Sequence, residues 1–269
     1  MDVHPWFLAA KRILDATFPG PKEHLRIADL GCLEGGYAVE FARLGFQTLG
    51  LDVREANIDA CRYVKSKVAL PGLEFVRDDA WNIPTYGTFD AVFCCGLLYH
   101  LDRPREFLNT LSAVTKRVLI LQTHFSQAGD SPSIIHPRRL RRALSRVFPL
   151  KNTATTTHKL SHLSKNEGLP GRWFSEFRNE RAFRDRKNRR WASWNNRKSF
   201  WVQREFLLQA LRESGFDVVL EQFDGLGSNI ALEMTEGSYR TSGRSTFIGI
   251  KTSYVSEFVP DVDTRVRQA

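Results

Sequence analysis

Apolar and polar positions alternate along the chain in a pattern that predicts an α/β fold. Five short apolar runs have the length of buried strands, at residues 26–30, 47–52, 73–76, 89–95 and 117–121. Between them apolar residues recur at helical spacing, which predicts helices over residues 36–44, from Ile58 to Val68, and from Pro104 onward. Strands that alternate with helices are typical of a mostly parallel sheet covered on both faces.

This rhythm stops after residue 123 and returns near Phe206. A helix is predicted from Phe206 until Gly215, followed by a strand over 216–223 and an edge strand over 245–250. We therefore divide the chain into an N-terminal helical segment (1–24), a core (25–123), an insertion (124–199), the rest of the core (200–251) and a C-terminal tail (252–269).

Glycines and acids mark the ends of the predicted strands. Gly31, Gly35 and Gly36 follow the first strand, where a backbone without side chains can approach a ligand closely. Leu33 stands where the dinucleotide motif G-x-G-x-x-G has its second glycine, so a cofactor without a pyrophosphate is favoured. Asp52 ends the second strand, where an acid accepts both hydrogen bonds of a ribose diol. Each acid also fits a plain helix cap, but their order along three strands favours a ligand site.

These motifs resemble those of class I S-adenosylmethionine-dependent methyltransferases. The resemblance rests on Asp29-Leu30-Gly31-Cys32 with Gly35-Gly36, on Leu51-Asp52, on Arg77-Asp78-Asp79-Ala80-Trp81, and on Phe89-Asp90-Ala91-Val92-Phe93-Cys94-Cys95-Gly96. It implies a Rossmann-like seven-stranded sheet with an antiparallel last strand, and S-adenosyl-L-methionine as cofactor. The residues implied to bind this cofactor are Asp29, Gly31, Cys32, Gly35, Gly36, Asp52, Val53, Asp79, Ala80, Trp81, Cys95 and Gly96. The family commonly has glycine at the position of Leu33, so the loop is expected to run differently there.

Histidines near two strand ends are candidates for a general base. Methyl transfer from a sulfonium demands mainly alignment and exclusion of water, but a hydroxyl acceptor benefits from a base. His124, after the fifth strand, is slightly favoured over His100, after the fourth, and Tyr99 is expected to line the same pocket. Either histidine also fits a structural role. No metal site is predicted, because histidine, cysteine and acidic residues show no metal-ligand spacing.

The insertion is strongly basic. Residues 124–199 hold 18 Lys and Arg against 5 Asp and Glu, whereas the whole chain has a net charge of +9, so the remainder is acidic on balance. Its aromatic residues include Trp173, Phe174, Phe177, Phe183, Trp191 and Trp194. This composition fits a lid over an anionic small molecule, a surface that holds RNA, or a solvated cap with no ligand.

A narrower similarity concerns Gly96-Leu97-Leu98-Tyr99-His100-Leu101 together with Trp194-Asn195-Asn196. These segments are similar to tRNA wobble-uridine carboxymethyl-transferring enzymes. Leu101-Asp102 stands where that group has a basic stretch, so ordinary methyl transfer is favoured.

The interpretation is a methyltransferase that acts on a small polar or anionic acceptor, such as a metabolite, sugar or natural product. The alternatives are an RNA-modifying or RNA-binding protein that docks through residues 124–199, and a cofactor-binding scaffold without turnover. The apolar runs are far shorter than the ~20 residues of a membrane helix, so a cytoplasmic protein without a membrane partner is expected. The sequence predicts no oligomeric state.

Overall fold

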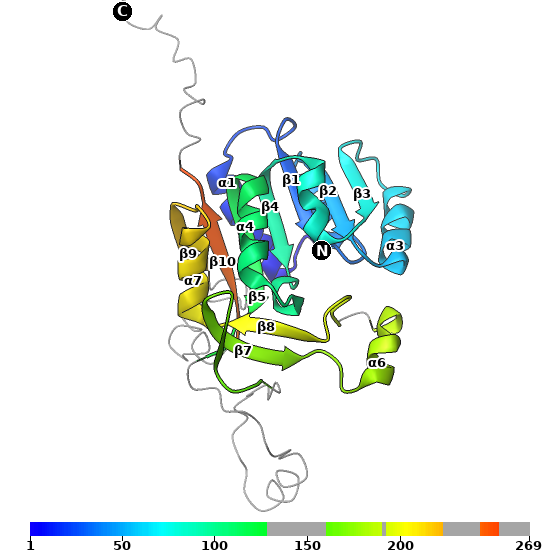
Figure 1. The fold of residues 1–269 in the computed structure, drawn as a ribbon. Helices are drawn as coiled ribbons and strands as arrows, with labels where there is room; N and C mark the ends of the chain where they lie inside the picture. The colour runs from blue at the N-terminus through cyan, green and yellow to red at the C-terminus, as the bar shows by residue number, and fades with distance from the viewer. Residues whose placement is uncertain (128–159, 190–191, 223–242, 253–269) are drawn as a thin grey trace, which may run out of the picture.

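The computed structural model describes residues 1–127, 160–189, 192–222 and 243–252. Figure 1 shows a main sheet flanked by helices, with a smaller sheet lying beyond one of its ends. The elements of the main body are α1 (Pro5–Thr17), β1 (Arg26–Leu30), α2 (Gly36–Arg43), β2 (Gln47–Asp52), α3 (Glu55–Lys65), β3 (Leu73–Arg77), η1 (Ala80–Tyr86), β4 (Phe89–Cys95), η2 (Leu98–His100), α4 (Pro104–Val114), β5 (Thr115–His124), α7 (Arg204–Glu213), β9 (Val218–Gln222) and β10 (Arg244–Ile250).

The main sheet has seven strands in the order β3-β2-β1-β4-β5-β10-β9. The pairs among β1 to β5 are parallel, whereas β10 runs antiparallel to both β5 and β9. The carboxyl ends of the parallel strands therefore lie at one edge, where open α/β sheets bind their ligands. The predicted α/β sheet with its antiparallel last strand is confirmed.

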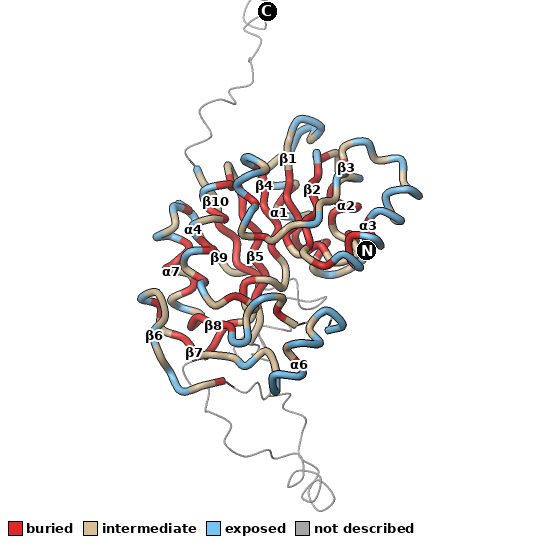
Figure 2. The backbone as a smooth tube through the Cα atoms, turned by 45° about the vertical axis from the view of Figure 1, so that its right-hand side comes forward, coloured by how far each residue is buried: buried red, intermediate tan, exposed pale blue. Residues whose placement is uncertain are grey.

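Helices cover both faces of this sheet, because successive strand residues point to opposite sides. On one face Ile27 packs with Phe41 of α2 and with residues of α1. On the other face Leu30 packs with Phe107 of α4 and Leu211 of α7. The strands form the buried interior of the molecule in Figure 2. Helix α4 begins at Pro104 as predicted, and it buries the predicted apolar face.

One strand lies elsewhere than expected. We expected residues 245–250 at an edge, but β10 lies between β5 and β9, and residues 245–249 are buried. The edge strand is β9, whose Val218 and Leu220 are exposed. Ser245 and Thr246 misled the prediction, since both are polar residues whose burial comes from pairing on two sides.

The described part of the insertion forms a second sheet. It contains β6 (Ser164–Asn166), β7 (Leu169–Ser175) and β8 (Lys198–Val202), all antiparallel, with α6 (Glu180–Arg184) and η3 (Arg186–Asn188) between β7 and β8. Strand β8 crosses the predicted boundary between residues 199 and 200. It joins the main body through Phe200 N–H, which donates to Leu101 O at 2.8 Å, and Trp201 Nε1–H, which donates to Tyr99 O at 3.0 Å.

Trp191, residues 128–159 of the insertion and the tail from residue 253 lie outside the described residues. Within the described ranges, no helix has the length and apolar character needed to cross a bilayer. The location in the cell stays a prediction.

Candidate active site

The loop between β1 and α2 has a left-handed backbone at three positions. Gly31, Leu33 and Gly35 have φ angles of 72°, 50° and 78°. A side chain at Gly35 would be impossible without rearrangement, since a Cβ atom there would lie 2.5 Å from Cζ of Phe75. Leu33 thus keeps the backbone conformation that glycine favours, at a cost of roughly 1–2 kcal/mol. A leucine in place of the family's glycine changes the side chain at this turn and leaves the backbone in a glycine-like conformation.

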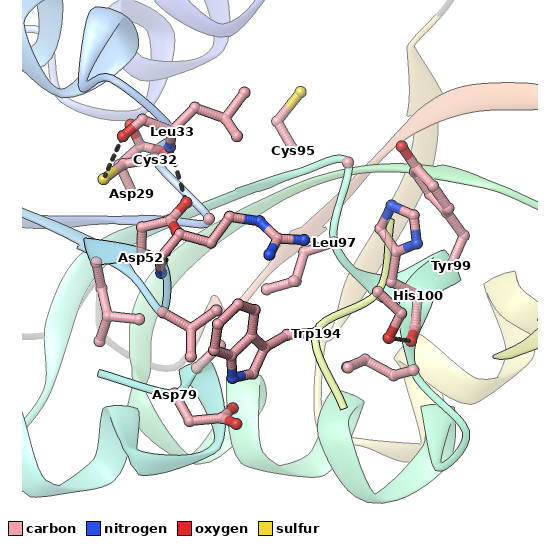
Figure 3. Close-up of a pocket in the computed structure, with 18 of the residues that line it drawn as sticks. Asp29, Cys32, Leu33, Asp52, Asp79, Cys95, Leu97, Tyr99, His100 and Trp194 are labelled. Carbon is pink, nitrogen blue, oxygen red and sulfur yellow. Dashed lines mark hydrogen bonds between the residues drawn. The ribbon is translucent and has the colours of Figure 1, made fainter. Parts of the chain in front are cut away.

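A cavity of about 520 Å³ opens beside this loop, at the carboxyl ends of the parallel strands. The residues predicted from sequence that line it are Asp29, Gly31, Cys32, Asp52, Val53, Asp79, Ala80, Trp81, Cys95, Gly96, Tyr99 and His100. Gly35, Gly36 and His124 are not among its lining residues. In Figure 3, Asp29 and Asp52 lie on one side of the cavity, and Tyr99 and His100 lie on the other.

Asp52 links the loop to the end of β2. Its Oδ2 accepts the backbone N–H of Leu33 at 3.1 Å, and its Oδ1 accepts that of Arg54 at 2.8 Å. Burial raises the pKa of Asp52, and the N–H group of Arg54 opposes this shift. A carboxylate has about four acceptor sites, so each oxygen retains capacity for one further donor from a ligand.

Asp29 is the more deeply buried of the two acids. The backbone N–H of Ala38 hydrogen-bonds to its carboxylate, but Oδ2 has no partner within the described part of the chain. Burial raises the pKa of Asp29 from 3.8 to about 7, and the charge of Asp52 adds to the shift. A buried acceptor without a donor is expensive, so a ligand with N–H groups or positive charge would be stabilised here.

This shift predicts a pH dependence of stability. Between the ordinary value of 3.8 and about 7, folded Asp29 holds a proton that the unfolded chain has lost. The free energy of unfolding of the free protein should therefore fall as pH rises, by at most about 1.4 kcal/mol per pH unit. Urea unfolding of Asp29→Asn should show a flatter dependence than the wild-type protein in this window. An unchanged slope would contradict the assignment.

The inserted segment closes the cavity on the side of the third strand. Asn195 Nδ2 donates to Asp79 Oδ2 at 3.0 Å, while Asp79 Oδ1 accepts the N–H of Trp81. Arg54 donates to the carbonyl oxygens of Arg189 and Ala192 at 3.0 and 2.5 Å. Its guanidinium also lies 5.0 Å from the ring centre of Trp194. Residues 192–196, which we call the cap loop, thus line the same cavity as the acids.

His100 is held in place from two directions. Its Nδ1 lies 2.9 Å from Oε1 of Glu176, whose side chain is 2% exposed. Ser199 donates to the same oxygen at 2.7 Å. The His100 carbonyl accepts bonds from Ser193 and Asn196 of the cap loop, at 3.0 and 2.9 Å. With Nδ1–H donated to Glu176, Nε2 is the ring nitrogen that accepts a proton.

His124 has a different environment. Its Nδ1 lies 3.0 Å from the carbonyl oxygen of Gly243, and its ring stacks on Trp201 with centroids 4.8 Å apart. Tyr99 lies between the two histidines, with its ring 4.3 Å from that of His100 and 4.7 Å from that of His124. The geometry therefore favours His100 over His124 as a base, contrary to the preference drawn from sequence.

A protein-family model described as a methyltransferase domain matches residues 28–119. In structure, the N-terminal domain of EvdMO1, solved with SAH bound, aligns with a TM-score of 0.62 over 93% of this chain and 82% of that chain, at 23% identity. The strand order with one antiparallel strand agrees with both findings. The chain belongs to the class I S-adenosylmethionine-dependent methyltransferases.

Curated relatives of this methyltransferase match over part of their length. The tRNA U34 carboxymethyltransferase of Campylobacter hominis is 28% identical over 134 residues, or 48% of this chain and 46% of that protein. The mitochondrial ubiquinone biosynthesis O-methyltransferase of Arabidopsis thaliana is 29% identical over 103 residues, or 38% of this chain and 32% of that protein. The chain thus spans less than half the length of these two relatives.

Several residues of the methyltransferase site were missed by the sequence analysis. Glu176 is one of few acids in a basic insertion, and no spacing links it to His100. His4, Trp6 and Arg244 also line the cavity, from the N-terminal segment and the start of β10. Trp194-Asn195-Asn196 did stand out in sequence, but only as a mark of similarity and without a role.

Proposed function

We propose that the chain binds S-adenosyl-L-methionine at the acidic side of the cavity and transfers its methyl group to a hydroxyl of a small acceptor at the His100 side. The observation that carries this proposal is a single cavity that joins Asp29 and Asp52 to a histidine oriented by a buried glutamate.

The residues at the acidic side fit this cofactor. Asp52 has acceptor capacity for a ribose diol, and Asp29 Oδ2 is a buried acceptor suited to an ammonium group. Gly31 leaves space beside the loop, since a Cβ atom there would lie no closer than 3.8 Å to Leu97. Leu33, Leu97 and Trp194 offer apolar surface for an adenine ring. The EvdMO1 domain, which has the same fold, was solved with SAH bound.

When bound, the cofactor supplies a methyl group on a sulfonium, which is already a good electrophile. The protein then has to position the acceptor, exclude water and receive a proton. In our proposal Nε2 of His100 takes the hydroxyl proton, and Glu176 stabilises the resulting imidazolium. The cap loop fixes the His100 backbone and shields the cavity from solvent.

A small acceptor is favoured because the described part of the insertion is turned toward the cavity. Its buried Glu176, its cap loop and β8 all contact the main body rather than forming a separate surface. The name of the Arabidopsis relative, an O-methyltransferase of ubiquinone biosynthesis, agrees with a hydroxyl of a small molecule as acceptor.

Two measurements test the proposal. Calorimetry should detect binding of S-adenosylhomocysteine to the full chain, and a labelled methyl group should enter small-molecule fractions of a cell extract after ribonuclease treatment. Failure of the product analogue to bind would refute the cofactor, whereas binding without transfer to any fraction would favour a scaffold.

RNA modification remains the second candidate, because the described insertion exposes Arg178, Arg181 and Arg184 around α6, and because one relative is a tRNA enzyme. Label that enters only fractions not treated with ribonuclease would favour it. Affinity for RNA would also fall steeply with salt, since each neutralised phosphate releases counterions.

A further inference from the structure

Arg244 occupies the acceptor side of the cavity. It is the first residue of β10 and pairs with His124 at the end of β5, so the antiparallel strand brings it to the carboxyl edge of the sheet. Its side chain lies over Gly96, where an added Cβ atom would be 3.3 Å from Nη2 of Arg244. Arg244 lines the cavity together with Tyr99 and His100.

The guanidinium of Arg244 is fixed in position. Its Nη2 donates to Oε1 of Gln122 at 2.6 Å, and the Gln122 side chain is buried on β5. Its carbon lies 4.6 Å from the ring centre of Trp6 and 5.5 Å from that of Tyr99. An arginine packed between two rings keeps its charge and its planar set of donors, and it is already ordered before a ligand arrives.

The charges of the cavity are separated along its length. Asp29, Asp52 and Asp79 lie toward the cofactor side, and Arg244 lies beside Tyr99. Among the described lining residues, Arg54 is the other arginine or lysine, and its guanidinium is engaged by carbonyl oxygens of the insertion. The acceptor side therefore presents one fixed cation, which matches a group with one negative charge.

We propose that Arg244 binds a carboxylate of the acceptor, so that the substrate is a small hydroxylated carboxylic acid. This inference rests on the proposed function and narrows its substrate class. A planar carboxylate matches the guanidinium fork better than a doubly charged phosphate, which usually recruits several donors. Tyr99 adjoins both His100 and Arg244, so the hydroxyl and the carboxylate would lie on either side of its ring.

The charge of the product tests the substrate class. Small molecules from a ribonuclease-treated extract are labelled with the wild-type protein and separated by anion exchange at about pH 7 and again at about pH 2. A carboxylate is charged at the first pH and neutral at the second, whereas a phosphate keeps a charge at both. Retention at pH 7 alone is expected. A neutral product, or one retained at pH 2, would overturn the proposal while leaving the proposed methyl transfer in place.

Variants test the role of Arg244 itself. For the labelled acceptor, Arg244→Gln should lower kcat/KM roughly 100-fold through a higher KM, since two charge-assisted hydrogen bonds are lost. Arg244→Lys should lie between this variant and the wild type. Arg43→Gln, on the exposed side of α2 in an ion pair with Glu40, is the matched control. Calorimetry with S-adenosylhomocysteine should give the same affinity for all four proteins. A tenfold loss of that affinity in Arg244→Gln would instead assign Arg244 to the cofactor, and unchanged kcat/KM would also overturn the proposal.

Discussion

Replacing Asp52 by alanine should weaken S-adenosylhomocysteine binding by roughly 100-fold. The variant loses the acceptor for a ribose diol, and each hydrogen bond to a charged group contributes about 1.5–3 kcal/mol. It also loses the acceptor for the N–H groups of Leu33 and Arg54, which at present orders both sides of the binding loop. Isothermal calorimetry on the full chain measures this effect directly.

Two further variants make the Asp52 result interpretable. Asp52→Asn keeps the shape, but its amide nitrogen has to face one of two backbone donors, so affinity should fall nearly as far as in Asp52→Ala. Asp59→Ala removes an exposed acid of α3 that pairs with Arg62, and it should bind like the wild type. Affinity that survives in Asp52→Ala, with the fold intact by circular dichroism, would refute the role of Asp52 and with it the proposed cofactor site.

The acidic side of the site was predictable from sequence because its determinants are local. Gly31, Asp29 and Asp52 stand at the ends of short apolar runs, and parallel strands carry their carboxyl ends to a common edge. Strand periodicity therefore places these residues together without knowledge of any long-range contact. The structure brings Asp29 and Asp52 to the same cavity in agreement with that expectation.

The acceptor side was less predictable because it is assembled from distant segments. Glu176 reaches His100 only through the folding of β7 against β8, a separation of 76 residues. Arg244 reaches the cavity because β10 is antiparallel and lies inside the sheet, where we had expected an edge strand. Periodicity in single segments contains no information about such pairings, which explains why His124 was preferred to His100.

His100→Ala should lower kcat by a factor of roughly 10² to 10⁴, the usual contribution of general acid–base catalysis. Affinity for S-adenosylhomocysteine should stay within about twofold of the wild type, because His100 lies away from the acids in the cavity. The acid limb of the pH profile of kcat/KM should also disappear, since a histidine base is inactive when protonated. His124→Ala provides the comparison, and we expect a much smaller loss, because its side chain does not line the cavity.

Glu176→Gln separates a positioning role from a purely structural one. Glutamine still offers an oxygen to Nδ1 of His100, but it lacks the charge that stabilises an imidazolium, and its amide group opposes the N–H of Ser193 or the hydroxyl of Ser199. We therefore expect kcat to fall by about tenfold or more with an altered pH profile and unchanged cofactor affinity. In the double variant with His100→Ala, the second substitution should cost little more, because both residues act through one proton acceptor. Full additivity of the two losses, or a larger loss in His124→Ala than in His100→Ala, would contradict the assignment of His100 as the base.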